Sequence, residues 1–125
     1  MMMFLTRTAG AVLLSITLSA TPALAQDAAA GGAQFKARCG ACHSIVPGQK
    51  AMLAPNLSGL AGRKAGSTAF TYSPALKASG LSWDKATLDK FLAAPMKAVP
   101  GTRMVISVPD AKQRADIVAY LSTLK

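Results

Sequence analysis

Residues 39–43 read Cys39-Gly40-Ala41-Cys42-His43, and no other stretch of the chain says as much about its fold. The spacing C-x-x-C-H is the attachment signature of c-type haem. Two thiols held on one helical turn can form thioethers with two vinyl groups on one edge of a porphyrin, and the adjacent imidazole of His43 then faces the iron as proximal ligand. The motif therefore predicts one covalently attached haem c per chain, held by Cys39 and Cys42, with iron bound by His43.

Three other uses of this motif are possible in principle. A closed zinc site needs four ligands of the Cys/His type, and the chain has two cysteines and one histidine. A thioredoxin-like redox pair needs a βαβ context, which the sequence does not show. A local disulfide is compatible with an exported protein but gives the adjacent histidine no purpose. Haem attachment accounts for all three side chains.

The second axial position of the iron is less constrained by the sequence. Because His43 is the single histidine, a methionine, a lysine or an open position remains. A thioether ligand favours Fe(II). After residue 25 the methionines are Met52, Met96 and Met104, and each of them could instead fill a gap in the core. We prefer Met104 over Met96 because it follows the rigid turn at residues 100–103, which can present a side chain inward.

The first 25 residues have the pattern of a secretory signal peptide. Arg7 supplies the positive start, residues 9–20 are apolar, and Ala23-Leu24-Ala25 is a small-residue cleavage site. The apolar run is shorter than the roughly 20 residues that a membrane span needs. We therefore expect a cleaved signal peptide over 1–25, one soluble domain over 26–125 in the periplasm, and no stable membrane insertion.

The charge balance restricts the partners. The whole chain has 14 Lys and Arg against 5 Asp and Glu, a net charge of +9, and loss of Arg7 with the signal peptide leaves +8. The basic residues are spread along the chain, without the interleaved aromatic residues that stack on nucleic-acid bases. This pattern predicts no nucleic-acid binding and leaves acidic protein partners, or an ordinary solvated surface, as alternatives.

Hydrophobic periodicity and capping residues predict an all-α fold of about four to five short helices with long loops around one haem. The first expected helix covers 33–38 and follows a fraying leader at 27–32. A second helix begins at Pro74 with Ser73 as its cap, and a third is capped by Ser82 and ends before Pro95, followed by a turn at 96–98. The last helix is capped by Asp110, and Gln113 completes a capping box. Residues 44–67 have no clear period and are expected to form a loop.

From Gly31 to Lys125 the chain resembles class I cytochrome c, the soluble monohaem type of bacteria and mitochondria. Residues 55–57 (PNL) and 59–63 (GLAGR) resemble the family's P-N-L…G-R loop, and residues 70–73 (FTYS) and 80–83 (GLSW) resemble its F-x-Y-S and G-x-x-W segments. Residues 100–104 (PGTRM) are similar to its P-G-T-K-M axial-ligand loop. Residues 116–121 resemble the helix whose aromatic residue packs on the N-terminal helix.

The resemblance implies roles for matching residues. Met104 becomes the distal iron ligand, and the carbonyl of Pro55 accepts a hydrogen bond from His43, which orients the imidazole. The other implied roles are haem-propionate donors at Arg63, Tyr72 and Trp83, a lining residue of the haem crevice at Thr102, and a crossing of the terminal helices at Gly31, Phe35, Ile117 and Tyr120. Trp83 as plain core and Arg63 as surface remain the alternatives.

Three residues depart from the family pattern. Phe91 stands where a tyrosine is often found near the distal methionine, Leu76 where an asparagine is common, and Ile106 where an aromatic residue is common. The first two changes remove polar partners from the distal side. They predict a drier distal side and an altered midpoint potential.

The motif and the resemblance together predict a periplasmic electron carrier of a respiratory chain, and not an enzyme. The implied donor is a cytochrome bc1-type complex or a dehydrogenase, and the implied acceptor is a terminal oxidase or a reaction centre. Arg38, Lys97 and Arg103 are candidates for basic residues around the haem edge that steer such acidic partners. A haem enzyme or sensor with an open sixth position, and a dedicated subunit of one dehydrogenase, are the alternatives.

Overall fold

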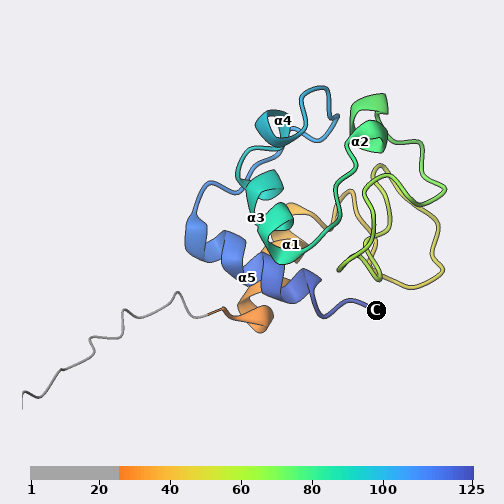
Figure 1. The fold of residues 1–125 in the computed structure, drawn as a ribbon. Helices are drawn as coiled ribbons and strands as arrows, with labels where there is room; N and C mark the ends of the chain where they lie inside the picture. Colours follow the sequence, from red (N-terminus) through yellow and green to blue (C-terminus); the bar gives the residue numbers. More distant parts are fainter. Residues whose placement is uncertain (1–25) are drawn as a thin grey trace, which may run out of the picture.

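The computed structural model describes residues 26–125, in which five helices are joined by long loops (Figure 1). The helices are α1 (Ala28–Arg38), α2 (Pro74–Ala78), α3 (Lys85–Ala93), α4 (Pro95–Ala98) and α5 (Ala111–Leu121). The only β-type pairing in this range is one isolated antiparallel bridge between Lys64 and Ser82. The predicted all-α fold is confirmed, whereas the predicted signal peptide over 1–25 lies outside the described residues.

The first and last helices cross closely and pack against each other (Figure 1). A Cβ atom on Gly31 of α1 would lie 1.9 Å from the carbonyl oxygen of Asp116 in α5, so only glycine fits at this contact. The rings of Phe35 and Tyr120 pack next to it with centroids 5.5 Å apart, and Ile117 is fully buried. The predicted crossing of the terminal helices is confirmed.

Helix α1 begins earlier than the sequence pattern predicted. Residues 28–32 are helical rather than a frayed leader, because the Asp27 carboxylate accepts the backbone N–H of Ala30 and caps the helix. The Asp27 N–H also donates to the buried carboxylate of Asp116, which ties the start of α1 to α5. Gly31 and Gly32 lower the helix propensity of this segment. The helix forms nevertheless, because Gly31 permits the close crossing with α5.

The predicted caps of α2 and α5 are confirmed, but Gln113 makes no return bond to Asp110, so the predicted capping box is not formed, and the predicted cap of α3 is wrong. Ser73 caps α2 with Pro74 at its first position, and Asp110 caps α5 by accepting the N–H of Gln113. Ser82 does not cap α3, because it lies in the extended bridge to Lys64. The cap is Asp84, whose carboxylate accepts the N–H of Thr87 at 2.7 Å.

The core lies between α1, α3 and α5 and continues into the loops that enclose the site. Its buried apolar side chains are Phe35, Leu60, Trp83, Leu88, Phe91, Leu92, Val99, Val108, Ile117, Val118 and Leu121. Among residues 26–125, no helix has the length and apolar character needed to cross a membrane.

Candidate haem site

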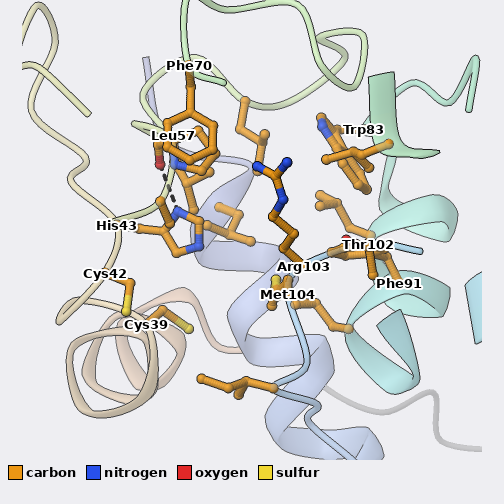
Figure 2. A pocket seen from close by; sticks show the side chains of 18 of the residues that line it. Cys39, Cys42, His43, Leu57, Phe70, Trp83, Phe91, Thr102, Arg103 and Met104 are labelled. Carbon is orange, nitrogen blue, oxygen red and sulfur yellow. Dashed lines mark hydrogen bonds between the residues drawn. The ribbon is translucent and has the colours of Figure 1, made fainter. Parts of the chain in front are cut away.

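A cavity of about 390 Å³ lies between the helices and the loops. This volume falls within the roughly 300–1,000 Å³ that small-molecule sites usually occupy. In Figure 2, Cys39, Cys42 and His43 lie on one side of it, and Thr102, Arg103 and Met104 lie on another. Most of the remaining wall is apolar, and it includes Leu57, Leu60, Phe70, Leu76, Leu88, Phe91 and Leu92.

The two cysteines lie on a single turn that follows the end of α1. The Cys39 N–H bonds to the carbonyl of Phe35, and the N–H groups of Cys42 and His43 both bond to the carbonyl of Cys39. Both thiols line the cavity, and no disulfide joins them. Burial raises the pKa of the Cys39 thiol, an effect that the positive charge of Arg38 opposes. The turn thus presents two thiols and one imidazole to the same cavity.

The His43 imidazole is held by the backbone of the following loop. Its Nδ1 lies 2.7 Å from the carbonyl oxygen of Pro55, and because a carbonyl only accepts, Nδ1 carries the proton and donates. Burial lowers the pKa of His43, and the hydrogen bond to Pro55 acts in the opposite direction. A neutral ring protonated at Nδ1 leaves the Nε2 lone pair free for a metal.

The three methionines of the described chain lie in different surroundings. Met104 lines the cavity and packs against the core. Met52 and Met96 are 50% and 55% exposed and do not line this cavity. Met52 lies with His43 in a second pocket, which neither cysteine lines. The structure therefore brings Met104, and neither of the other two, to the cavity that both cysteines and His43 line.

Arg63 carries an unused hydrogen-bond donor. Its Nη1 and Nη2 atoms donate to the carbonyls of Ser58 and Asn56 at 2.9 and 3.2 Å, so the side chain is anchored to the loop and is not a free surface group. Its Nε is buried and has no partner among the described residues. A buried donor without a partner costs about 1–3 kcal/mol, and Arg63 lines the cavity. A carboxylate in the cavity, such as a haem propionate, would satisfy it.

The other predicted haem-contact residues also line this cavity. The Tyr72 hydroxyl is hydrogen-bonded to the Thr68 hydroxyl. Trp83 is buried and packs edge-on against Phe91 with ring centroids 5.0 Å apart, so it serves the core as well as the cavity wall. Thr102 is buried in the wall beside Met104. Their roles toward a bound haem remain predictions.

Sequence reasoning missed one feature of the site and one contact outside it. Leu53 and Val105 line the cavity and are 80% and 68% exposed, so the mouth has an apolar rim that Ile106 extends. A single apolar residue in a loop gives no sequence signal for such a rim. The contact outside the site is an ion pair between Arg114 and Asp89, whose partners are far apart in the sequence.

The family model for cytochrome c matches residues 28–125. The chain belongs to the cytochrome c family. The chain is 49% identical over 90 residues to cytochrome c2 of Rhodoblastus acidophilus, covering 70% of this chain and 84% of that protein. It is 42% identical over 111 residues to cytochrome c2 of Rhodomicrobium vannielii, covering 87% and 88%. Among solved structures, cytochrome cH from Methylobacterium extorquens matches with a TM-score of 0.72 and 47% identity, over 78% of this chain and 98% of that one.

Membership of the cytochrome c family confirms several predictions. The chain is a class I monohaem cytochrome c that carries covalent haem c, and Cys39 and Cys42 fit the attachment motif. Its biochemical role is electron transfer rather than enzymatic catalysis. The cavity fits this cofactor, because it collects two unpaired thiols, an oriented imidazole and the free Nε donor of Arg63.

Proposed function

We propose that this cytochrome is a periplasmic electron shuttle whose haem iron is bound by His43 and Met104. The haem c supplies a one-electron Fe(III)/Fe(II) couple when bound. The chain supplies the attachment points, the axial ligands, a largely apolar enclosure and a charged entrance. Each of these is supported by residues that line the same cavity.

The observation that carries the proposal is the position of Met104. It is the one methionine among residues 26–125 that lines the cavity shared by Cys39, Cys42 and His43. Met52 meets His43 only in a second pocket that neither cysteine lines, and Met96 lines neither pocket. A closed His/Met pair leaves no coordination position for a substrate, and it allows the iron to change oxidation state with little rearrangement. These properties favour an electron carrier over an open-site haem enzyme or sensor.

The mouth of the cavity supports transient docking of acidic redox proteins. Arg38 and Arg103 are exposed and line the cavity, and Leu53, Val105 and Ile106 form an apolar rim around it. Lys97, the third predicted steering residue, is exposed on α4 and does not line the cavity. An apolar contact surrounded by positive charge suits short-lived complexes with acidic partners. A cytochrome bc1-type complex or a dehydrogenase is the proposed donor, and a terminal oxidase or a reaction centre the proposed acceptor.

Absorption spectra of the purified protein in both oxidation states test the axial ligation. We expect a low-spin spectrum with the charge-transfer band of a methionine sulfur bound to Fe(III). Met104→Ala should abolish that band and give high-spin iron, whereas the matched variants Met96→Ala and Met52→Ala should keep it. A wild-type spectrum of five-coordinate high-spin iron, or a band that survives in Met104→Ala, would overturn the proposed ligation.

Cell fractionation with mass spectrometry tests the proposed export. The mature haem protein should appear in the periplasmic fraction, with the mass of a chain that begins at Gln26 and carries one haem. A cytoplasmic protein that retains residues 1–25 would contradict both the signal peptide and the shuttle.

A further inference from the structure

The segment that carries Met104 has backbone hydrogen bonds at its two ends and none between them in the described chain. The Thr102 N–H bonds to the carbonyl of Val99, and the Val108 N–H bonds to the carbonyl of Leu92. Between these points, residues 103–107 make no backbone hydrogen bond within the described chain. Val105 and Ile106 are exposed, so little packing holds the middle of the segment. The Arg103 side chain adds one hydrogen bond, from Nη1 to the Thr71 carbonyl at 3.2 Å, and Met104 packs against the core. The position of Met104 depends on these contacts and on how firmly the two ends are fixed.

Arg114 of α5 fixes the C-terminal end of this segment. Its Nη1 donates to the carbonyls of Val108 and Pro109 at 3.0 and 3.1 Å, and its Nε donates to the carboxylate of Asp89 on α3 at 2.6 Å. The Arg114 side chain is only 14% exposed, whereas that of Asp89 is 47% exposed. One guanidinium thus joins α3, α5 and the end of the Met104 segment.

We propose that Arg114, held by Asp89, is a positioning residue that keeps Met104 in place as the sixth ligand. Neither residue lines the haem cavity, so they act through the 103–109 segment rather than by contact with the cofactor. Without this brace, the end of the segment is held only by the Val108–Leu92 hydrogen bond and the buried Val108 side chain. Met104 then leaves the iron more readily and opens it to an external ligand. The inference rests on the proposed His43/Met104 ligation.

The planar guanidinium is what makes this brace possible. It can donate in different directions from Nε and Nη1 at once, and it remains charged at every physiological pH. A lysine at this position would keep the positive charge but could not reproduce the fork. Hydrogen bonds of this charged kind are about twice as strong as neutral ones.

Imidazole titration of the ferric holoprotein tests the proposal, because imidazole binds only when the sixth ligand leaves. We expect imidazole to bind Arg114→Gln about tenfold more tightly than wild type, a change of about 1.4 kcal/mol. Arg114→Lys should fall between the two, and Asp89→Asn should shift affinity in the same direction by a smaller factor. The last two variants carry the test if Arg114→Gln does not mature with haem.

Lys112→Gln is the matched control. It removes the other ion pair of α5, Lys112 with Asp116, and among the described residues the Lys112 side chain has its one hydrogen bond to Asp116. Its imidazole affinity should stay within about twofold of wild type. Unfolding of every variant in guanidinium chloride distinguishes local release of Met104 from loss of the whole fold. Equal shifts in Lys112→Gln and Arg114→Gln, or no shift in Arg114→Gln, would overturn the brace alone. A wild-type ferric protein without the methionine charge-transfer band would overturn the ligation, and the brace with it.

Discussion

Arg63 illustrates how one side chain links the loop to the cofactor cavity. Two of its nitrogens are used by the carbonyls of Ser58 and Asn56, and its Nε is left over in a buried position. A structure without a cofactor gains nothing from such an unpaired donor. The same atom becomes favourable once a haem propionate lies beside it, since hydrogen bonds to charged groups are the stronger kind.

Replacing Arg63 should therefore affect both stability and potential. In Arg63→Leu, the part-buried carbonyls of Ser58 and Asn56 lose their donors, and we expect the free energy of unfolding of the holoprotein to fall by about 2–4 kcal/mol. The midpoint potential should fall as well, because a positive charge near the iron favours Fe(II). Guanidinium unfolding and a redox titration measure the two effects. Arg63→Lys, which keeps the charge, should lower the potential less, and a wild-type potential in Arg63→Leu would contradict the proposed propionate contact.

At the scale of helices, the crossing of α1 and α5 depends on the absence of a side chain at Gly31. The contact with the Asp116 carbonyl is to backbone, which cannot move aside as a flexible side chain can. The neighbouring Gly32 is in a different situation, because a Cβ there would meet the Tyr120 ring at 3.2 Å. The two glycines are adjacent in the sequence but differ in what surrounds them.

We expect Gly31→Ala to be strongly destabilising and Gly32→Ala to be mild. The first variant must push the helices apart, which should cost about 3 kcal/mol or more. The second asks only the Tyr120 ring to shift, and the gain of about 1 kcal/mol in helix propensity offsets part of that cost. Denaturant unfolding of the two holoproteins gives the comparison, and equal losses in the two would show that the close crossing is not what requires glycine.

Asp116 adds a pH-dependent tie between the same two helices. Lys112 donates to its Oδ1 at 2.5 Å, and the Asp27 N–H donates to the same atom at 2.9 Å. The hydrogen bond from Lys112 and then the one from Asp27 hold the pKa of Asp116 below its ordinary value of 3.8. A carboxyl whose pKa is lowered by folding stabilises the native state above its unfolded pKa, and this contribution disappears as the pH falls through the folded-state pKa.

The comparison of wild type with Asp116→Asn should therefore depend on pH. The melting temperature of wild type should exceed that of the variant by a constant margin from neutral pH down to about pH 4. Below pH 3.8 the margin should shrink, because this carboxyl takes up its proton first in the unfolded chain, and the loss is complete once the folded chain is protonated as well. Thermal unfolding followed by circular dichroism from pH 7 to pH 2 measures it. A margin that does not change with pH would mean that the charge of Asp116 has no part in the tie.

At the scale of the whole molecule, the net charge of +8 on residues 26–125 acts over longer distances than any single contact. Positive charge at the cavity mouth raises the rate of encounter with acidic partners, and salt screens it over a Debye length of about 8–10 Å. Arg38 and Arg103 are both exposed at that mouth. The charge should therefore govern how fast partners associate rather than how the chain folds.

Electron transfer to an acidic redox partner should slow as ionic strength rises. Arg103→Gln should lower the second-order rate constant at low salt by about threefold to tenfold, and the effect should vanish at high salt. Lys85→Gln removes the same charge from α3, outside the cavity lining, and should have a smaller effect. Stopped-flow kinetics over a range of ionic strength measure both variants. Rates that do not depend on salt would contradict steering.

Local patterns in the sequence predicted the parts of the site that depend on neighbouring residues. The C-x-x-C-H spacing lies within one helical turn, so it specifies the cofactor without knowledge of the rest of the fold. Ser73 and Asp110 were correct as caps because a cap acts on an N–H three residues away. The prediction that Ser82 caps α3 was wrong, because Ser82 pairs with Lys64, 18 residues earlier, and α3 begins after Asp84, which is its cap.

What remained undecided in the sequence depends on contacts between distant segments. Periodicity could not show that residues 28–32 are helical, because the Asp27–Asp116 contact and the fit of Gly31 against α5 exist only after folding. The unpaired Nε of Arg63 and the brace from Arg114 to Asp89 likewise exist only after folding, so the sequence pattern does not show them. The helical class and the haem-binding motif follow from the sequence alone, since both arise from short-range spacing. Which methionine lines the cavity with the two cysteines, and what holds its segment there, follows from the fold, because burial is a property of the assembled chain.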